Sequence, residues 1–252
     1  MAGNSSSPGA SVTTRALALL GAFDEQHRRL TLTELAARAG LPLPTAHRLV
    51  GELAAWGAVS RTPSGEYVVG RRLWDLGLLA PVQTGLRQVA SPFLHDIYAA
   101  TLATVHLAVR DGTEVLYLDR LAGHTSVPVV SRVGTRLPMH ATGVGKVLLA
   151  HAPPEVQAAV LADLPRITAY TVTQPGLLRR QLARAVREGY ATTSEEMSLG
   201  ACSVAVPIRR RADVVAALGI VVPSLKDRAR LVAALQVAAQ GVGRELARTS
   251  GQ

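Results

Sequence analysis

The sequence is poor in cysteine and has no long apolar run. Cys202 is the only cysteine among the 252 residues, which excludes an intramolecular disulfide framework and suits a reducing compartment. No apolar run approaches the roughly 18 residues that a membrane-spanning helix needs. The N-terminus also lacks an apolar segment behind a basic one, which is the pattern of a secretory signal. These absences predict a soluble, cytoplasmic protein without a membrane partner.

Lysine and acidic residues are scarce beside arginine. The chain carries 27 Lys and Arg against 18 Asp and Glu, a formal net charge of +9, which suits a polyanionic partner such as nucleic acid. The excess is uneven, because residues 1–75 hold eight Arg against six acidic residues. Charge alone therefore does not single out the N-terminal part as the polyanion-binding part.

Two short helices joined by a tight turn are predicted between residues 32 and 56. Thr31 or Thr33 together with Glu34 resembles a capping box at the start of the first helix, and Gly40 supplies the left-handed residue that ends it. Such a pair is typical of a helix-turn-helix, in which the second helix enters a DNA major groove. For these residues alone, a helical hairpin in a larger core explains the pattern equally well.

The second of these helices has one apolar stripe and one polar face. Ala46, Leu49, Val50 and Leu53 recur at the helical period and are expected to face a core. The opposite side would be free to contact DNA. The candidate DNA-contacting residues of this helix are Thr45, His47, Arg48 and Glu52.

A β-hairpin is predicted directly after these helices. Ala58–Arg61 and Glu66–Val69 are β-prone runs, and the turn between them ends at Gly65, which accepts positive φ. With a preceding helix from Val12 to Phe23, the pattern is that of a winged helix-turn-helix, and Arg61 is expected to reach a phosphate or the minor groove. The expected inner face of the preceding helix is Ala16, Leu17, Leu20 and Phe23.

The chain then changes from helical to strand periodicity. Two helical segments, Leu73–Ala80 and Gly85–Ala103, are expected to break near Pro81 and Pro92. From Thr104 apolar residues alternate at a period of two. This change predicts a second domain after a helical connector.

The second part of the chain is predicted as an α+β domain with an antiparallel sheet. Strands at 105–110 and 114–120 flank Asp111-Gly112, a strong hairpin signal, and a further strand is expected at Val127–Val133. Gly143 and Gly145 open a helix from about Val144 to Ala152. Further helices are expected at 154–164, 177–188 and 225–247, and further strands at 191–193, 203–209 and 214–222.

Four segments in register resemble the IclR family of bacterial transcriptional regulators. They are TELAARAGLPLPTAHRLVGEL, RVGTRLPMHATGVGKVLLA, REGYATTSEEMSLG and GACSVAVPI. The resemblance implies a winged helix-turn-helix at 12–72, a linker helix at 73–88, and a GAF/PAS-like effector-binding and oligomerisation domain at 89–249. It also implies homodimers or dimers of dimers on double-stranded operator DNA. Residues 1–11 are rich in Ser, Gly and Pro, which predicts a disordered lead.

The family's recognition helix corresponds to Pro42–Leu53. Leu43 and Pro44 stand where members of the family often have polar or basic residues, so fewer phosphate contacts are expected at the start of this helix. With the weak local charge, this predicts DNA binding through a dimer and few contacts.

The family's small-molecule effector site carries over residue by residue. Backbone N–H groups at the helix start after Gly143 would suit an anion. The effector-binding positions that the resemblance implies are Val129, Leu137, Gly143, Val144, Thr193, Ala201, Ser203, Gly219 and Val221.

Several of these positions differ from those of members that bind small acids. Gly219 and Val221 replace hydroxyl residues, Thr193 replaces an acidic residue, and Ser203 stands at the thiol position, one place after Cys202. An unpaired polar headgroup would cost roughly 1–3 kcal/mol. A roomier, more apolar pocket for an aromatic or larger carboxylate is therefore expected.

Enzymatic motifs are weak. Gly145-Lys146 does not complete a phosphate-binding loop, because His140 precedes it by five residues and Val147 follows, so Lys146 is expected in an ion pair or on a helix surface. Glu195-Glu196 is expected to be structural, since adjacent side chains point apart. His106, His140 and His151 lack metal-ligand spacing.

The sequence therefore predicts a ligand-responsive regulator of metabolic genes, repressor or activator, with no catalytic residue, metal or cofactor. Two alternatives stay open. One is a small-molecule enzyme with an appended DNA-binding-like domain, which the effector positions do not favour because they include no base. The other is a regulator of the same architecture that binds no effector.

Overall fold

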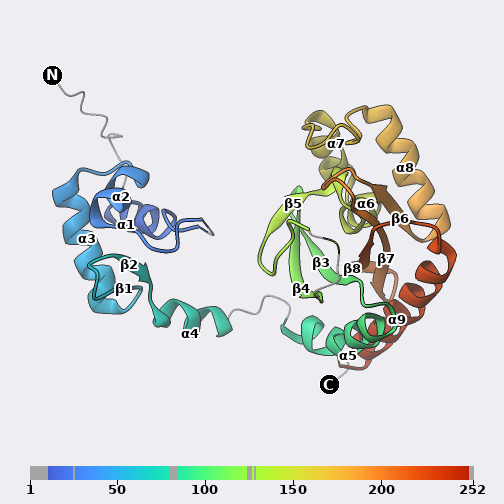
Figure 1. The fold of residues 1–252 in the computed structure, drawn as a ribbon, viewed down its shortest axis with the longest axis horizontal. Coiled ribbons are helices and arrows are strands. Elements are labelled where there is room, and N and C mark those ends of the chain that lie inside the picture. The colour runs from blue at the N-terminus through green and yellow to red at the C-terminus, as the bar shows by residue number, and fades with distance from the viewer. Residues whose placement is uncertain (1–10, 25, 80–83, 124–126, 128, 250–252) are drawn as a thin grey trace. The chain divides into compact units, whose positions relative to one another are not determined.

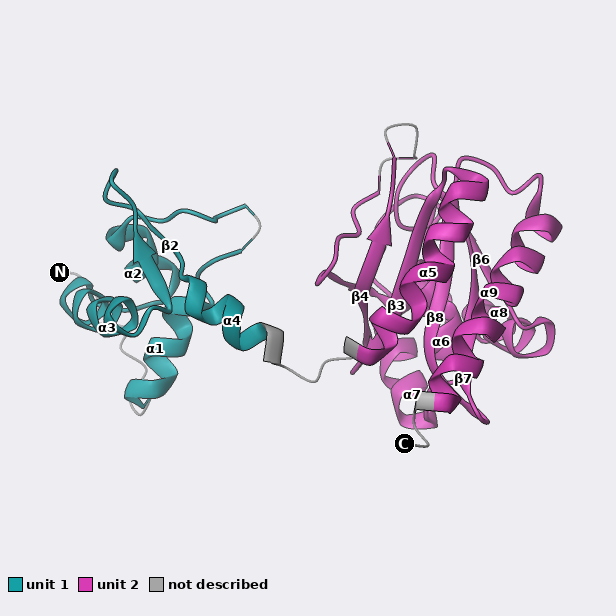
Figure 2. Ribbon diagram, turned by 90° about the horizontal axis from the view of Figure 1, so that it is seen from below, with its two compact units in different colours: residues 1–82 teal, residues 83–252 magenta. Residues whose placement is uncertain are grey.

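The computed structural model describes residues 11–24, 26–79, 84–123, 127 and 129–249. The chain forms two compact units, residues 1–82 and 83–252 (Figure 2). The predicted disordered lead, apart from Ser11, and the predicted break near Pro81 lie outside the described residues. Each unit has a hydrophobic core of its own.

The first unit begins with two helices, α1 (Val12–Leu20) and α2 (Leu32–Arg38). The predicted capping box of α2 is confirmed: Thr31 accepts a hydrogen bond from the backbone N–H of Glu34, whose carboxylate accepts one from the backbone N–H of Thr31. Gly40 follows at φ +64°, the left-handed conformation expected after the helix. Local sequence therefore determines both ends of this helix.

Helix α3 (Leu43–Trp56) completes the three-helix core. The predicted stripe is confirmed, since Ala46, Leu49 and Val50 are buried. The predicted face of α1 is wrong at one position, because Leu17 is 60% exposed and the neighbouring Leu19 is buried instead. Helix α1 also ends at Leu20, three residues earlier than expected, and Leu19 is its buried residue.

The predicted β-hairpin is confirmed as β1 (Val59–Arg61) paired antiparallel with β2 (Tyr67–Val69). Gly65 in its turn has φ +90°. Leu30 bridges to Tyr67, so the segment before α2 joins the edge of the hairpin. Helix α4 (Arg71–Leu79) follows, giving a winged helix-turn-helix arrangement.

The second unit is built on an antiparallel sheet. In the described part of the chain six strands pair in the order β5-β4-β3-β8-β7-β6 (Figure 1). The predicted Asp111-Gly112 hairpin is confirmed, with Gly112 at φ +61°. The strands are β3 (Thr104–Asp111), β4 (Glu114–Leu121), β5 (Arg136–Pro138), β6 (Ala191–Ser194), β7 (Cys202–Arg210) and β8 (Asp213–Val222).

The strand predicted at Val127–Val133 is wrong for the residues that the structure describes; Pro128 lies outside them. The edge strand is β5, which pairs with β4 through Arg136–Pro138. Val130 and Val133 are each about half exposed. β-prone residues indicate a fit to a half-buried sheet surface, not a fixed strand, and here the segment contacts a cavity instead.

Helices cover both faces of the sheet (Figure 1). Helices α5 (Thr84–Thr101) and α9 (Arg228–Thr249) pack against one face. The other face is covered by a 3-10 turn at Met139–Ala141 and three helices. These helices are α6 (Gly143–Ala150), α7 (Pro154–Ala162) and α8 (Pro175–Glu188).

The helix break predicted near Pro92 is wrong, because α5 continues through this residue. A proline inside a helix removes one backbone hydrogen bond and strains the preceding turn. Phe93 lies against Gly241 of α9, where an added Cβ would stand 2.3 Å from the phenyl ring. Close packing of α5 on α9 accounts for the continuous helix.

None of the described helices combines the length and apolarity that a membrane span requires.

Candidate functional site

Helix α3 of the first unit exposes most of the residues expected to contact DNA. His47, Arg48 and Glu52 are exposed, whereas Thr45 is half-buried. The Arg48 guanidinium donates a hydrogen bond to the Glu52 carboxylate one turn later. This pair places the Arg48 guanidinium along the exposed surface of the helix.

The start of α3 offers few backbone donors. Pro42 is its N-cap and Pro44 lies in the first turn, and neither has an N–H. Leu43 between them is 47% exposed. Because helix N-termini bind phosphate through free N–H groups, this start is a poor phosphate site, as the sequence leads one to expect.

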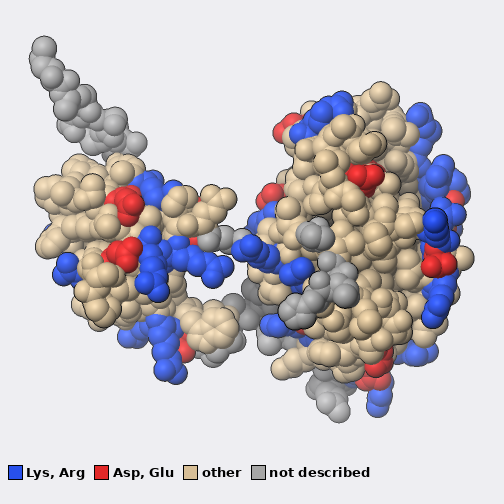
Figure 3. Space-filling view, viewed as in Figure 1, with Lys and Arg blue, Asp and Glu red and all other residues tan. Residues whose placement is uncertain are grey.

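Arg61 is the last residue of β1, in the β1–β2 hairpin that forms the wing of the winged helix-turn-helix. Its guanidinium is 5.9 Å from the centre of the Tyr67 ring, and its Nε donates to the Gly65 carbonyl at 3.3 Å. Both contacts are exposed and leave most of its donors available. In Figure 3 the visible face of this unit carries scattered Arg with Asp and Glu among them.

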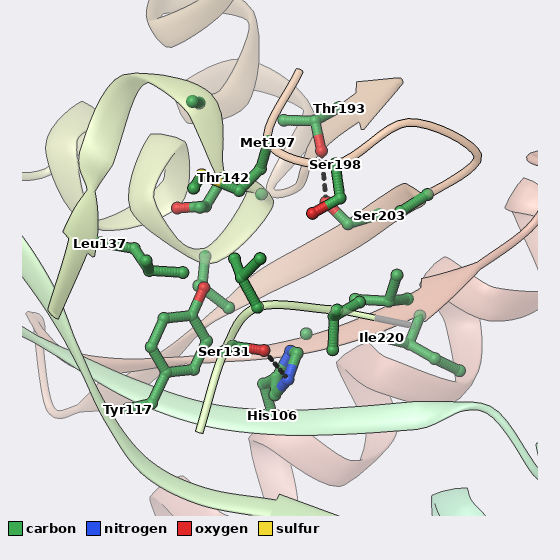
Figure 4. Close-up of a pocket in the computed structure, with 18 of the residues that line it drawn as sticks. His106, Tyr117, Ser131, Leu137, Thr142, Thr193, Met197, Ser198, Ser203 and Ile220 are labelled. Atoms are coloured by element: carbon green, nitrogen blue, oxygen red, sulfur yellow. Dashed lines mark hydrogen bonds between the residues drawn. The ribbon is translucent and has the colours of Figure 1, made fainter. Parts of the chain in front are cut away.

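The second unit contains a cavity of about 480 Å³ on the α6 side of the sheet (Figure 4). This volume includes space that is open to solvent. The structure brings all nine positions implied by the resemblance into its lining. Ten further described residues line it, namely His106, Tyr117, Val130, Ser131, Ala141, Thr142, Met197, Ser198, Val204 and Ile220.

Strand register explains how distant residues meet in the cavity. Thr193 of β6 pairs with Ser203 of β7, which pairs with Val221 of β8. Gly219 of β8 pairs with His106 of β3. Since paired residues share a face, the sheet presents a floor of mostly small side chains beneath α6.

The start of α6 forms one wall of the cavity. The Thr142 side chain caps the Gly145 N–H at 3.1 Å, and the first helical hydrogen bond runs from Lys146 to the Thr142 carbonyl. The N–H groups of Gly143 and Val144 precede that bond and have no partner within the helix. They lie at the positive end of the helix dipole, where an anion is stabilised.

Two hydroxyl groups stand beside this helix start. Thr193 Oγ1 and Ser203 Oγ are 2.6 Å apart. A Cβ added to Gly143 would lie 2.5 Å from Ser203 Oγ, so glycine is required for this close approach. The two hydroxyls therefore lie beside the helix start at Gly143, and we call this part of the cavity the anion corner.

A second polar cluster comes from other elements. The Ser131 hydroxyl and His106 Nε2 are 2.7 Å apart. The His106 and Tyr117 rings pack edge to face, with their centroids 4.9 Å apart. Figure 4 shows His106 and Ser131 turned toward each other. These groups were not predicted, although a histidine on an apolar strand was a signal that could have identified one of them.

Burial sets the protonation of this second cluster. Desolvation, with the positive charge of Arg120 as a smaller cause, lowers the pKa of His106 to about 3. Burial also raises the pKa of the Tyr117 phenol well above its ordinary value. Both groups are neutral near pH 7 and can offer hydrogen bonds without net charge.

The nine implied positions include no base, but His106 also lines the pocket. The pair of Ser131 with His106 nevertheless lacks the properties of a nucleophile and its base. A general base must become an imidazolium, which burial and Arg120 oppose. Among the described lining residues no carboxylate is present to stabilise that cation.

Lys146 is not on the helix surface, which corrects one of the two expectations for it. Its side chain is 1% exposed and forms the other expected feature, an ion pair, with Glu196 at 2.6 Å. Burial lowers the pKa of Lys146 and raises that of Glu196. The charge and the hydrogen bond of each partner act in the opposite direction on the pKa of the other. Glu195 points elsewhere, with its carboxylate accepting the Gly200 N–H at 2.8 Å.

The remaining candidates are separated in space. His140 Nε2 contacts the Pro165 carbonyl and His151 Nδ1 contacts the Val147 carbonyl. Among the residues that the structure describes, no three His, Cys, Asp or Glu side chains gather as a metal site would require. Cys202 is buried with its Sγ near Ser194 and Pro223, outside the lining of the cavity.

Two family models together match nearly the whole chain. A model described as the IclR helix-turn-helix domain matches residues 12–63, and one described as the bacterial transcriptional regulator IclR C-terminal domain matches residues 80–244. The chain belongs to the IclR family. Both the predicted family and the predicted α+β fold are thereby confirmed.

Relatives of known role are transcriptional regulators, not enzymes. XynR, a helix-turn-helix regulator of Escherichia coli, is 34% identical over 210 residues, which cover 82% of this chain and 83% of XynR. The Pca operon regulatory protein of Acinetobacter baylyi is 31% identical over 221 residues, 84% and 79% of the two chains.

One solved structure of an IclR homolog contains a ligand. The homolog, from Microbacterium hydrocarbonoxydans, is complexed with 4-hydroxybenzoate and is 39% identical to this chain. The match covers 95% of this chain and all of that one, with a TM-score of 0.90.

Proposed function

We propose that this protein is a ligand-responsive transcriptional regulator that binds double-stranded operator DNA as a homodimer or a dimer of dimers. Its effector is a small aromatic carboxylate held in the cavity of the second unit. Each first unit presents α3 and the wing to one half-site, so two half-sites one or more helical turns apart are expected. The sign of regulation, repression or activation, depends on which state the ligand favours.

The observation that supports this ligand class is the combination of two polar clusters with apolar side chains in one cavity lining. The anion corner combines the helix start at Gly143 with Thr193 and Ser203. At the other cluster, His106 and Ser131 are neutral hydrogen-bonding groups. The lining also includes the apolar residues Val129, Leu137, Val144 and Val221.

A ligand that matches this pattern has a carboxylate at one end, a flat apolar body and a neutral polar group at the other end. The 4-hydroxybenzoate found with the Microbacterium homolog has this chemistry. A two-carbon acid would occupy the anion corner alone and leave the second cluster without a ligand contact. This arrangement agrees with the expectation of a larger acid, although the pocket is more polar than its nine implied positions predict.

Ligand control of DNA binding follows from differential affinity. A ligand shifts an equilibrium between two arrangements of the dimer only by the ratio of its affinities for them. The proposed effector therefore changes operator affinity only if its affinity for the arrangement that binds DNA differs from its affinity for the other arrangement. Because of this condition, the effect of the ligand on DNA affinity must equal the effect of DNA on ligand affinity, and both can be measured.

A matched ligand panel tests the proposal. Calorimetry with 4-hydroxybenzoate, benzoate, phenol and glyoxylate should give the tightest binding for 4-hydroxybenzoate. Loss of the hydroxyl should weaken binding by about 0.5–1.5 kcal/mol, and loss of the carboxylate, which accepts charge-assisted bonds, by about 1.5–3 kcal/mol. Tighter binding of glyoxylate than of 4-hydroxybenzoate would overturn the assignment of an aromatic acid.

One structural feature favours a second candidate, a regulator that binds no effector. Thr193 bonds to Ser203 and Ser131 bonds to His106, so these groups have partners without a ligand. If no member of a broad carboxylate panel raises the melting temperature, this candidate replaces the first, because a ligand specific to the folded state must stabilise it.

A further inference from the structure

Lys146 is among the largest fully buried side chains in the described structure. Its ammonium donates to both carboxylate oxygens of Glu196, at 2.6 and 2.7 Å, and to the Gln181 side-chain oxygen at 2.7 Å. A buried ion pair gains little over well-packed apolar residues. A contribution to stability therefore does not by itself explain why this pair is present.

The two partners lie on two different elements that each contribute other residues to the lining of the effector cavity. Lys146 lies on α6, three residues after Gly143 in the anion corner. Glu196 lies in residues 195–201, between β6 and β7, which we call the cover segment. Met197, Ser198 and Ala201 of this segment line the cavity. The ion pair therefore joins a helix and a segment that both contribute to this lining.

The cover segment has contacts that define its own shape. The Thr168 hydroxyl donates to the Glu195 carbonyl at 2.7 Å, and the Thr171 hydroxyl donates to the Glu196 carbonyl at 2.8 Å. Glu195 has φ +55° and accepts the Gly200 N–H. These bonds hold the segment to itself and to the loop before α8, but they do not involve α6.

Neither partner is among the residues that line the effector cavity. Lys146 instead lines a separate cavity of about 430 Å³ with Gln181 and Arg184 of α8. Any effect of the pair on a ligand must therefore pass through the backbone of the cover segment. This arrangement excludes a direct contact of Lys146 with a ligand in the first cavity.

We propose that Lys146 and Glu196 are positioning residues that hold the cover segment at a fixed distance from the start of α6, and so set the affinity for the effector. The proposal rests on the proposed effector site. Breaking the pair leaves a buried charge without its partner. The cover segment then moves away from α6, which separates Met197 and Ser198 from the anion corner.

Hydrogen exchange on the full-length protein tests the position of the segment without any ligand. Variants Lys146→Met and Glu196→Gln remove one charge each, and a double variant removes both. In each variant the exchange of amides in residues 195–201 should accelerate at least about tenfold more than that of amides in β7 and β8. If the pair acts as a unit, the double variant should exchange no faster than either single one.

The control is Arg184→Gln, which breaks the exposed pair of Arg184 with Glu188, 3.9 Å apart. It alters the neighbouring cavity but leaves Lys146 and Glu196 in place, so the cover segment should exchange as in the wild type. If either single variant fails to fold, the double variant, which leaves no buried charge unpaired, gives the comparison with Arg184→Gln.

Binding of 4-hydroxybenzoate is measured on the same variants. Its Kd should rise about tenfold in Lys146→Met and Glu196→Gln, and DNA affinity without ligand should stay unchanged, because the effect of a contact between walls is local. If the wild type does not bind this acid, the proposed ligand fails, whereas the exchange measurement still tests the ion pair. Equal acceleration across the whole unit, or an unchanged cover segment, would overturn the positioning role.

Discussion

The two units place their candidate binding residues in opposite environments. In the first, His47, Arg48 and Arg61 are exposed side chains whose contacts are few and local. In the second, His106 and Thr193 are only 4% and 6% exposed, within the walls of a cavity. Changes on α3 should thus alter DNA binding without unfolding the unit, whereas changes in the cavity affect ligand affinity and folding together.

The charged side chains of the two units also differ in their exposure to solvent. The first unit relies on single exposed cations, whose ion pairs contribute about 0–1 kcal/mol each to stability. The second holds Lys146 and Glu196 out of water, where losing one partner is strongly destabilising. The comparison yields four predictions, in order of expected effect.

The largest effect is expected from Arg48→Ala. A lost base contact costs about 1–3 kcal/mol, and a dimer loses two, so operator binding should fall by roughly 100-fold or more. The thermal midpoint should stay unchanged, because Arg48 is exposed and contacts Glu52 alone among its described partners.

The matched control for Arg48→Ala is Arg71→Ala, which removes another exposed arginine paired one turn away, with Asp75. It should retain operator binding within a few-fold. Operator binding by Arg48→Ala at the wild-type level would mean that α3 faces DNA with a different side.

Gly143→Ala should come next. Its methyl group would displace Ser203 Oγ, because an added Cβ would stand only 2.5 Å from that oxygen, and the anion corner would be disrupted. Affinity for 4-hydroxybenzoate should fall by about 10- to 100-fold, as for the loss of hydrogen bonds to a charged group. Gly176→Ala, where nothing lies within 4 Å, serves as the control in calorimetry and should bind like the wild type.

His106 should make the stability of the second unit depend on pH. Its pKa of about 3 when folded lies below roughly 6.5 when unfolded, so the unfolded state takes up the proton first. Stability is therefore lost as pH falls below about 6.5. At pH 5 the loss relative to neutral pH should be about 2 kcal/mol.

Thermal melts at pH 7 and pH 5 measure this effect. The drop should shrink in His106→Gln and remain in His95→Gln, which changes an exposed histidine on α5. An identical drop in the wild type and in His106→Gln would contradict the burial of a neutral His106.

The smallest effect is expected from Thr193→Val, which removes one hydroxyl from the anion corner at constant shape. Losing one hydrogen bond costs about 0.5–1.5 kcal/mol, so the Kd for 4-hydroxybenzoate should rise about threefold to tenfold in calorimetry. Thr192→Val, at the adjacent position of β6 and outside the lining of the cavity, is the control. Unchanged binding by Thr193→Val would place the carboxylate elsewhere.

The sequence predicted those features that local chemistry determines. The capping box at Thr31 and Glu34, the stripe of α3 and the glycine turns of the hairpins depend on residues a few positions apart. The nine cavity positions came from the resemblance to the family, not from local pattern. The structure shows that these residues share one lining, and their contact with an effector remains a prediction.

The features that the sequence did not predict depend on contacts between distant segments. Pro92 stays helical because Phe93 packs on Gly241, almost 150 residues later. Lys146 is buried because Glu196 reaches it from another segment. The polar cluster at His106 needs Ser131, which lies in a segment expected to form a strand. Periodicity does not specify such partners.

The central claim is that a ligand in the second unit changes the affinity of the first unit for DNA. Fluorescence anisotropy of a labelled DNA fragment from upstream of the gene, titrated at several salt and 4-hydroxybenzoate concentrations, tests it most directly. We expect DNA binding that weakens with salt and a DNA affinity that the acid shifts by about 5- to 150-fold. Saturation of the cavity by the acid, shown by calorimetry, with no change in DNA affinity would contradict the account.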